Sequence, residues 1–149
     1  MPQIDIREVS NQQELAEMFD QRWLVLRSPL GMEKGSEKDS HEEGALHLIA
    51  ACDDKIIGSA RLRESSPGLG NISYVAVLPE FQNQGIGTKL IESLIAKAQA
   101  KSIKTLRLKS RINAIKFYQK IGFIEQGNQM DFLGIPHVFM ELEIKPRFL

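Results

Sequence analysis

The sequence has little of what a secreted, metal-binding or membrane protein needs. Its 149 residues include one cysteine, Cys52, so neither an internal disulfide nor a multi-cysteine metal site can form. Cys52 follows two alanines in a predicted strand, and we expect it to be a small buried side chain. No apolar run is longer than Tyr74 to Leu78, which is far too short to span a bilayer. The first residues show no basic segment followed by an apolar stretch, so we expect a cytoplasmic protein without a membrane partner.

An excess of charge of one sign is also missing. Nineteen Lys and Arg residues balance 19 Asp and Glu residues, which gives a formal net charge of zero. Dedicated nucleic-acid-binding domains usually carry a basic excess, so we expect no nucleic-acid partner. The hydrophobic content of 42% and charged content of 26% are typical of a globular protein, and the length suits one domain over residues 1–149.

The hydrophobic pattern predicts a mixed α/β fold. A strand over 4–9 precedes a helix whose capping box is predicted at Ser10 and Gln13. Strands over 46–51 and 55–63 flank a tight Asp53-Asp54 turn, which predicts a hairpin. The later elements are predicted as a strand over 72–78, a helix over 86–98, a strand over 104–109, a short helix from Asn113 ended by Gly122, and a last strand over 138–144.

The most informative segment joins the strand over 72–78 to the next helix. It reads Val77-Leu78-Pro79-Glu80-Phe81-Gln82-Asn83-Gln84-Gly85-Ile86-Gly87-Thr88. Gly85 and Gly87 let backbone N–H groups converge where the helix begins, and the first turn of a helix favours a phosphate. A strand–helix turn that needs glycine only for its geometry explains the same residues. The segment is neither a P-loop nor a dinucleotide fingerprint, which would require glycine in place of Leu90.

Two motifs together resemble a known family. Gln82-x-x-Gly85-x-Gly87, after a strand that ends in Val75-Ala76-Val77, resembles the acetyl-CoA motif of the GNAT superfamily of N-acetyltransferases. Asn113-Ala114-x-x-Phe117-Tyr118-x-x-x-Gly122-Phe123 resembles the segment that these enzymes place after the next strand. The chain is most similar to the small, single-domain bacterial type. The resemblance implies the acyl-CoA N-acyltransferase fold: a central, mostly antiparallel sheet with splayed central strands, flanked by helices.

The resemblance also implies which residues bind acetyl-CoA, the co-substrate. No metal-ligand spacing is present, so we expect no metal. The backbone of Val75, Ala76 and Val77 would pair with the pantetheine arm. Asn113 would hold the pantetheine or the adenosine-side phosphates through its amide, and Tyr118 would lie near the thioester sulfur and act as general acid. The pyrophosphate would be held by the N–H groups of Gln82, Asn83, Gln84, Gly85, Ile86, Gly87 and Thr88. Asn83 stands where relatives often have glycine, and it fits there with a negative or left-handed φ.

The implied activity is direct transfer of an acetyl group, within a ternary complex, from acetyl-CoA to a primary amine of a small molecule or peptide. A non-catalytic acyl-CoA-binding or sensing module is the alternative, because no obvious general base is present. Glu64, Tyr74, His47, His137 and water all remain candidates for the base. The acceptor amine and the acyl-chain preference stay open, and the family leaves room for a homodimer.

Two charged segments add to this interpretation. The loop over 31–44 has five acidic residues and two lysines; an acidic entrance for a cationic amine and a solvated loop explain it equally well. A basic segment between Ser93 and Ile124 contains no acidic residue, which indicates either a positive field near the CoA phosphates or a solvated basic face. Its members are Lys97, Lys101, Lys104, Arg107, Lys109, Arg111, Lys116 and Lys120.

Overall fold

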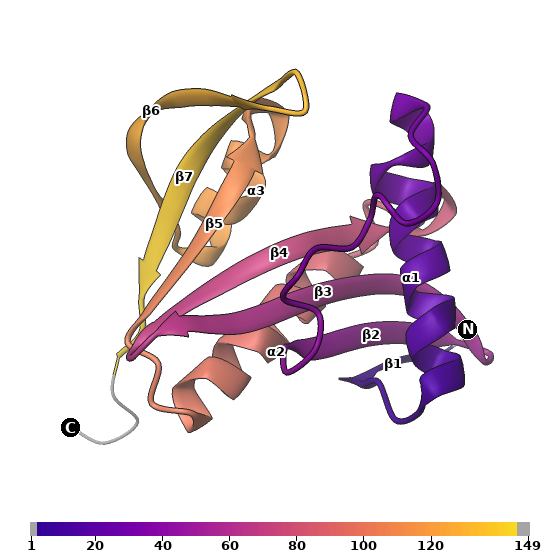
Figure 1. Ribbon diagram of the computed structural model, residues 1–149. Helices are drawn as coiled ribbons and strands as arrows, with labels where there is room; N and C mark the ends of the chain where they lie inside the picture. Colours follow the sequence, from indigo (N-terminus) through magenta and orange to yellow (C-terminus); the bar gives the residue numbers. More distant parts are fainter. Residues whose placement is uncertain (1–2, 146–149) are drawn as a thin grey trace. The chain divides into compact units, whose positions relative to one another are not determined.

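The computed structural model describes residues 3–145 (Figure 1). Its strands are β1 (Ile4–Glu8), β2 (Leu46–Cys52), β3 (Lys55–Ser66), β4 (Leu69–Val77), β5 (Thr105–Arg111), β6 (Ile124–Phe132) and β7 (Ile135–Glu143). Its α-helices are α1 (Gln12–Leu26), α2 (Ile86–Ala100) and α3 (Ile115–Ile121), with short 3-10 helices η1 (Ser28–Leu30), η2 (Pro79–Phe81) and η3 (Ile112–Ala114). The strands form one sheet in the order β1-β2-β3-β4-β5-β7-β6, in which β4 and β5 pair in parallel. The predicted mixed, mostly antiparallel sheet is confirmed.

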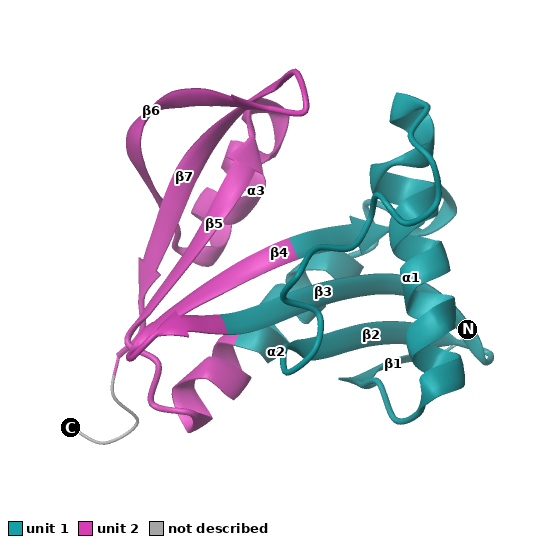
Figure 2. Cartoon of the chain, viewed as in Figure 1, with its two compact units in different colours: residues 1–63, 74–94 teal, residues 64–73, 95–149 magenta. Residues whose placement is uncertain are grey.

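The chain forms two compact units, which Figure 2 distinguishes by colour. Unit 1 runs up to residue 63 and includes 74–94, whereas unit 2 comprises 64–73 and the chain from residue 95 onward. One domain over 1–149 therefore stays a prediction. Within the described residues, every helix is too short or too polar to cross a membrane.

In unit 1, helices α1 and α2 pack on opposite faces of the sheet. Met18 of α1 contacts Ile49 and Ile56 in a fully apolar cluster. The residue after Ile49 in β2 points to the other face, because side chains alternate along a strand. There a Cβ on Gly58 would lie 3.1 Å from Leu90 Cδ1 of α2, so the glycine permits close packing of this helix. Buried on both faces, β2 and β3 show runs of apolar residues rather than simple alternation.

The cap of α1 lies one residue later than the sequence pattern predicts. Asn11 is the N-cap, and its Oδ1 accepts a hydrogen bond from the Glu14 N–H at 2.8 Å. The Glu14 carboxylate in turn accepts bonds from the N–H and Oγ of Ser10, at 2.9 and 2.8 Å. The predicted Ser10–Gln13 box is therefore wrong. Glu14 takes the place of Gln13 because its carboxylate also pairs with Arg7 of β1, which an amide could not do as strongly.

Unit 2 contains a strand that the sequence pattern did not predict. Strand β6 pairs with β7 at the edge of the sheet, and most of its residues are exposed and polar. Its register shifts between Gln126 and Met130, where Gly127 has a φ of +76°. A polar edge strand with a bulge has no apolar alternation, and so it lacks the signal on which strand prediction depends.

The connection from β5 to the last helix of unit 2 matches the prediction in outline. Asn113 lies in η3, one turn before α3 begins at Ile115, rather than in the α-helix itself. Gly122 ends α3 with a φ of +124°, and its N–H returns to the carbonyl groups of Tyr118 and Gln119. The predicted glycine cap is confirmed.

The predicted Asp53-Asp54 turn is confirmed and provides a test of the fold. Cys52 pairs with Lys55, and both turn residues are left-handed, with φ values of 49° and 65°. A two-residue hairpin turn of this kind favours glycine at its second position. We expect Asp54→Gly to raise the free energy of unfolding by about 0.5–1 kcal/mol relative to Asp54→Ala, which keeps the Cβ. Urea unfolding of both variants measures the difference, and equal stabilities would contradict the turn geometry.

Candidate functional site

The loop between β4 and α2 brings backbone N–H groups to the start of a helix. Asn83 and Gly85 are both left-handed, with φ values of 62° and 81°. The left-handed region is one of the two conformations in which Asn83 was expected to fit, since its short polar side chain tolerates it. The carbonyl of Gly85 accepts the N–H of Lys89 at 3.1 Å. The N–H groups of the residues between them, in the first turn of α2, therefore have no acceptor within the helix.

This first turn is suited to an anion. It contains no acidic side chain, so the partial positive charge of the helix end is not offset by a neighbouring carboxylate. The loop is held in place by two amide side chains. Gln82 donates from Nε2 to the carbonyl of Val77 at 3.0 Å, and Gln84 donates to the carbonyl of Glu80 at 3.2 Å. The side chain of Gln82 thus braces the end of β4, which leaves anion binding to the backbone.

The end of β4 presents its backbone groups to two different edges. The N–H of Leu78 donates to the carbonyl of Ile57 in β3 at 2.8 Å, and the carbonyl of Ala76 accepts Nε2 of Gln21 at 3.1 Å. Because backbone groups alternate along a strand, those of Val75 and Val77 point to the opposite edge.

A buried amide side chain from α1 interrupts the ladder beside Ala76. Gln21 is 3% exposed, and its Nε2 lies between the carbonyls of Ala76 and Ile57, 3.1 and 3.4 Å away. Ser59 donates to Gln21 Oε1 at 2.6 Å. The carbonyl of Ala76, one of the groups predicted to pair with the pantetheine arm, is thus already bound within the protein.

In unit 2, Tyr118 is buried among aromatic rings. It is 8% exposed, and its ring meets those of Phe117 and Phe123 edge-on, with centroid distances of 4.9 and 5.8 Å. Burial raises the pKa of Tyr118 to about 12, because the phenolate would lose its hydration. The hydroxyl therefore keeps its proton at neutral pH. Asn113 is exposed at η3, so its amide is accessible to solvent.

The predicted site residues divide between the units. Residues 75–77 and 82–88 lie in unit 1, where one continuous segment carries them. Asn113 and Tyr118 lie in unit 2, on neighbouring turns of η3 and α3.

Both histidines considered as general bases are held by carbonyl groups. His137 Nδ1 lies 2.8 Å from the carbonyl of Ile135, and His47 Nε2 lies 2.9 Å from the carbonyl of Glu42. A carbonyl can only accept, so in each ring this nitrogen is the donor. Burial, aided by Arg22, lowers the pKa of His47, which keeps this ring neutral.

The other two base candidates also have contacts of their own. The carboxylate of Glu64 accepts the N–H of Gly68 at 3.1 Å and closes the turn between β3 and β4. Tyr74 has a φ of +56° within β4, and its ring faces the guanidinium groups of Arg22 and Arg61. Burial, aided by nearby carboxylates, raises the pKa of Tyr74 and so opposes its use as a base.

Two buried arginines of unit 1 account for much of the acidic loop. Arg22 is fully buried and pairs with Glu42 at 2.9 Å, while Arg61 forms a bidentate pair with Asp39 at 2.7 and 3.0 Å. Arg61 holds the pKa of Asp39 at about 2 by hydrogen bonding. Two of the five acidic residues in the 31–44 loop are therefore counterions of the interior, and an acidic entrance formed by the whole loop is not supported.

The sequence signal for this cluster is the position of Arg22. Met18, Arg22 and Leu26 are spaced four apart on α1, so an arginine occupies a position of the apolar stripe. Sequence reasoning missed this position, together with Arg61 in β3. A charged residue at a core position needs a buried partner, which is the observation that could have found the cluster.

The basic segment of unit 2 is partly neutralised. Arg107 of β5 pairs with Glu141 of β7, with Nη2 to Oε2 at 2.6 Å and Nε to Oε2 at 2.8 Å. Thr105 donates to Glu143 of β7 at 3.1 Å. Counting charges along the sequence overlooked these acids because β7 lies outside the basic segment. The positive field of this segment is accordingly weaker than its eight basic residues imply.

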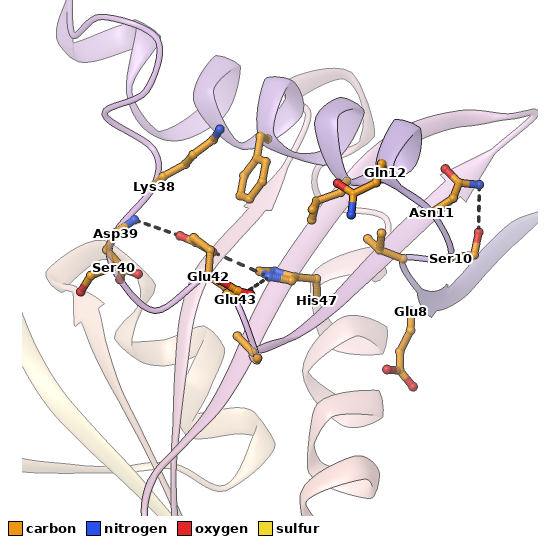
Figure 3. A pocket seen from close by; sticks show the side chains of 15 residues that line it. Glu8, Ser10, Asn11, Gln12, Lys38, Asp39, Ser40, Glu42, Glu43 and His47 are labelled. Atoms are coloured by element: carbon orange, nitrogen blue, oxygen red, sulfur yellow. Dashed lines mark hydrogen bonds and ion pairs between the residues drawn. The ribbon is translucent and has the colours of Figure 1, made fainter.

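A pocket of about 800 Å³ lies beside α1 and the 38–45 segment in unit 1 (Figure 3). Its wall combines apolar side chains with charged ones, and Figure 3 shows Glu42 linked to His47 on one side. Lys38 places its ammonium 4.5 Å from the ring centroid of Phe19. Within residues 3–145, three or more His, Cys, Asp or Glu side chains nowhere gather as a metal site would require.

Comparison with known proteins identifies the family. The model described as an acetyltransferase (GNAT) domain matches residues 10–144. A Bacillus subtilis protein named as a candidate acetyltransferase is 23% identical over 140 residues, covering 92% of this chain and 95% of its own. The ribosomal-protein-S18-alanine N-acetyltransferase of Escherichia coli has a TM-score of 0.78 at 21% identity, with 99% of both chains covered. A GNAT family acetyltransferase of Elizabethkingia anophelis, solved with acetyl-CoA bound, has a TM-score of 0.73 at 21% identity, covering 94% of this chain and 97% of that one.

The strand order and the likeness to the solved structures define the fold as that of the acyl-CoA N-acyltransferases. Because the family model spans nearly the whole chain, this chain belongs to the GNAT acetyltransferase family. The predicted fold and family are confirmed. The enzyme class is acetyl-CoA-dependent acyl transfer.

The burial of Tyr118 predicts a distinct titration. The chain has two tyrosines, and near pH 10 an ordinary tyrosine is half ionised, whereas a pKa of about 12 leaves about 1% of Tyr118 as phenolate. We expect the folded wild type and folded Tyr118→Phe to give the same phenolate absorbance near pH 10. After unfolding in urea, the wild type should give the larger signal. A larger signal from the folded wild type would contradict the burial of this hydroxyl.

Proposed function

We propose that this chain transfers the acetyl group of acetyl-CoA directly to a primary amine of a small molecule or a peptide, within a ternary complex. The observation that carries the proposal is the start of α2, where a left-handed loop precedes a helix turn without acidic side chains. Such a turn combines unpaired N–H donors with a partial positive charge, which is the requirement of a pyrophosphate. The Elizabethkingia relative of the same fold binds acetyl-CoA, which supports this ligand.

Within the predicted segment, the N–H groups of Asn83, Gln84, Gly85, Ile86, Gly87 and Thr88 would hold the pyrophosphate, because the N–H of Gln82 already donates to the carbonyl of Pro79 at 3.3 Å. The side chain of Gln82 is used within the protein, so backbone N–H groups supply the donors. The backbone groups of Val75 and the N–H of Val77 would receive the pantetheine arm as an added strand, because they point away from β3. The carbonyl of Val77 already accepts Nε2 of Gln82. Ala76 lies between them with its carbonyl bound to Gln21, and Asn113 would add a side-chain amide.

Tyr118 would assist the leaving thiolate. The neutral amine nitrogen forms a bond to the thioester carbonyl carbon, the carbon–sulfur bond breaks, and its electron pair stays on sulfur. Sulfur takes a proton from the Tyr118 hydroxyl, and the proton lost by the amine returns to that oxygen through water. The pKa of about 12 makes full proton loss to a thiolate uphill, so the hydroxyl acts mainly as a hydrogen-bond donor until the amine proton becomes available.

Water serves as the base in this proposal. The contacts of Glu64, Tyr74 and the two histidines orient these side chains toward neighbouring groups of the fold. A primary amine that reaches the site unprotonated needs no side-chain base, which makes the rate rise with pH as the amine loses its proton.

The turnover of acetyl-CoA with a panel of small amines and peptides that have free N-termini tests the proposed activity. Release of free thiol and acetylation of one class of amine are expected. Tight binding of acetyl-CoA without turnover of any amine would instead favour the binding module.

The cradle at α2 predicts the effect of a charge at Gly87. Gly87→Glu places a carboxylate at the second residue of the helix, where the pyrophosphate would lie. Like charges in contact cost several kcal/mol, so we expect the affinity for acetyl-CoA to fall by about 10²-fold or more. Calorimetric titration measures the affinity, and circular dichroism checks the fold. Ala96→Glu, an exposed position further along the same helix, is the matched control and should bind normally. Unchanged affinity in folded Gly87→Glu would show that the loop is only a turn.

The role proposed for Tyr118 predicts that removing its hydroxyl lowers kcat and leaves the KM for acetyl-CoA nearly unchanged. Tyr118→Phe keeps the ring that packs on Phe117 and Phe123 but removes the hydroxyl. Loss of a general acid typically lowers the rate by about 10²–10⁴-fold, and we expect this loss in kcat with the KM for acetyl-CoA nearly unchanged. A donor with a more acidic leaving thiol should show a smaller loss. A folded variant with the wild-type kcat, measured where chemistry is slow, would make Tyr118 a packing residue.

A further inference from the structure

Tyr74 has a backbone conformation that is unusual inside a strand. It lies in β4 directly before Val75 and has a φ of +56°. The left-handed region crowds the Cβ of any residue other than glycine, and a bulky side chain is rare there. Surrounding contacts must therefore hold Tyr74 in this state.

The ring of Tyr74 is surrounded by guanidinium groups. The Cζ of Arg22 lies 4.0 Å from its centroid, that of Arg61 lies 4.9 Å away, and that of Arg27 lies 5.7 Å away. All three distances fall within the range of cation–π attraction. The hydroxyl lies 3.4 Å from Asp39 Oδ2, so both the face and the edge of the ring have partners.

Carboxylates hold the two nearer guanidinium groups in place. Glu42 accepts from Arg22 at 2.9 Å and lies 3.1 Å from Arg61, and Asp39 binds Arg61 through both oxygens. Yet Nε and Nη2 of Arg22 and Nε of Arg61 are buried with no hydrogen-bond partner. A buried charge that is only partly hydrogen-bonded needs another source of stabilisation, and the ring face of Tyr74 supplies it.

A left-handed residue within a strand changes which edge the following backbone groups face. It acts as a bulge, after which the alternation of N–H and C=O groups resumes in a new phase. Here the alternation resumes with Ala76 and Leu78 directed to Gln21 and β3, and with Val75 and Val77 directed to the opposite edge.

We propose that Tyr74 is a positioning residue for acetyl-CoA: Arg22 and Arg61 clamp its ring, keep its backbone left-handed, and so direct the backbone groups of Val75 and the N–H of Val77 toward the pantetheine arm. The inference rests on the proposed function, since it assigns a role in binding this co-substrate. Tyr74 touches no reacting atom in this scheme and acts through the strand that follows it.

The test compares two variants that lack the ring but differ in backbone freedom. Glycine adopts a positive φ readily and alanine does not, so we expect Tyr74→Gly to bind acetyl-CoA about fivefold more tightly than Tyr74→Ala. Tyr74→Phe keeps the clamped ring and should stay within about threefold of the wild-type Kd. For all three, the effect should fall on the Kd and the KM for acetyl-CoA, with kcat at saturation little changed. A residue that only packs would make glycine equal to or worse than alanine.

Leu133 provides a matched control. It is a second bulky left-handed residue, with a φ of 54° in the β6–β7 turn of unit 2. Leu133→Gly and Leu133→Ala should differ in melting temperature, as the Tyr74 pair does, but should bind acetyl-CoA equally. If Tyr74→Ala does not fold, Tyr74→Leu replaces it and the same fivefold gap from Tyr74→Gly is expected.

The possible outcomes distinguish a failure of the proposed function from a failure of the role assigned to Tyr74. A wild-type protein that binds no acetyl-CoA would overturn the proposed function together with this inference. Wild-type binding, combined with equal Kd values for folded Tyr74→Gly and Tyr74→Ala, would overturn the inference alone. Loss of binding in folded Tyr74→Phe would also overturn it, because the hydroxyl rather than the clamped ring would then be responsible.

Discussion

A buried guanidinium cannot be hydrated, so the protein must surround it with carboxylates and aromatic faces. Arg22 and Arg61 place two such groups inside unit 1, and their counterions come from the segment between α1 and β2. This requirement ties a polar segment without regular strands or α-helix to β3, to α1 and to the ring of Tyr74 in β4. Removing one charge would leave another buried and unpaired, so the loss of any one member would destabilise the whole cluster.

The elements with a strong local signal could be predicted from the sequence. Helix α2 carries an apolar stripe, begins directly after Gly85 and covers a buried face, so propensity and packing agree. The Asp53-Asp54 turn was equally local, because two adjacent residues that tolerate positive φ define it. Strand β6 had no such signal: it is polar, lies at an edge and is interrupted by a bulge, and only its pairing with β7 makes it a strand.

In the candidate site, too, the features with a local sequence signal could be predicted and the others could not. The loop before α2 could be found because its glycine spacing is contained in a few consecutive residues. The position of Arg22 in the apolar stripe signals a buried charge, but the partners of the arginines and of Gln21 could not be identified, since they lie tens of residues away and meet only after folding. Counting charges along the 31–44 loop gave its net charge correctly. It did not show that Asp39 and Glu42 lie against buried arginines.

The position of the chain's one thiol affects how the reaction can be followed. Acetyl transfer from a thioester liberates a thiol, and disulfide reagents that change colour on exchange detect such groups. Cys52, the only cysteine of the sequence, is 7% exposed on β2. Disulfide exchange requires access to a thiolate, and a folded enzyme therefore contributes little background colour. Slow appearance of that background would report opening of unit 1, so the same reagent reads both product formation and the integrity of the strand beneath α1.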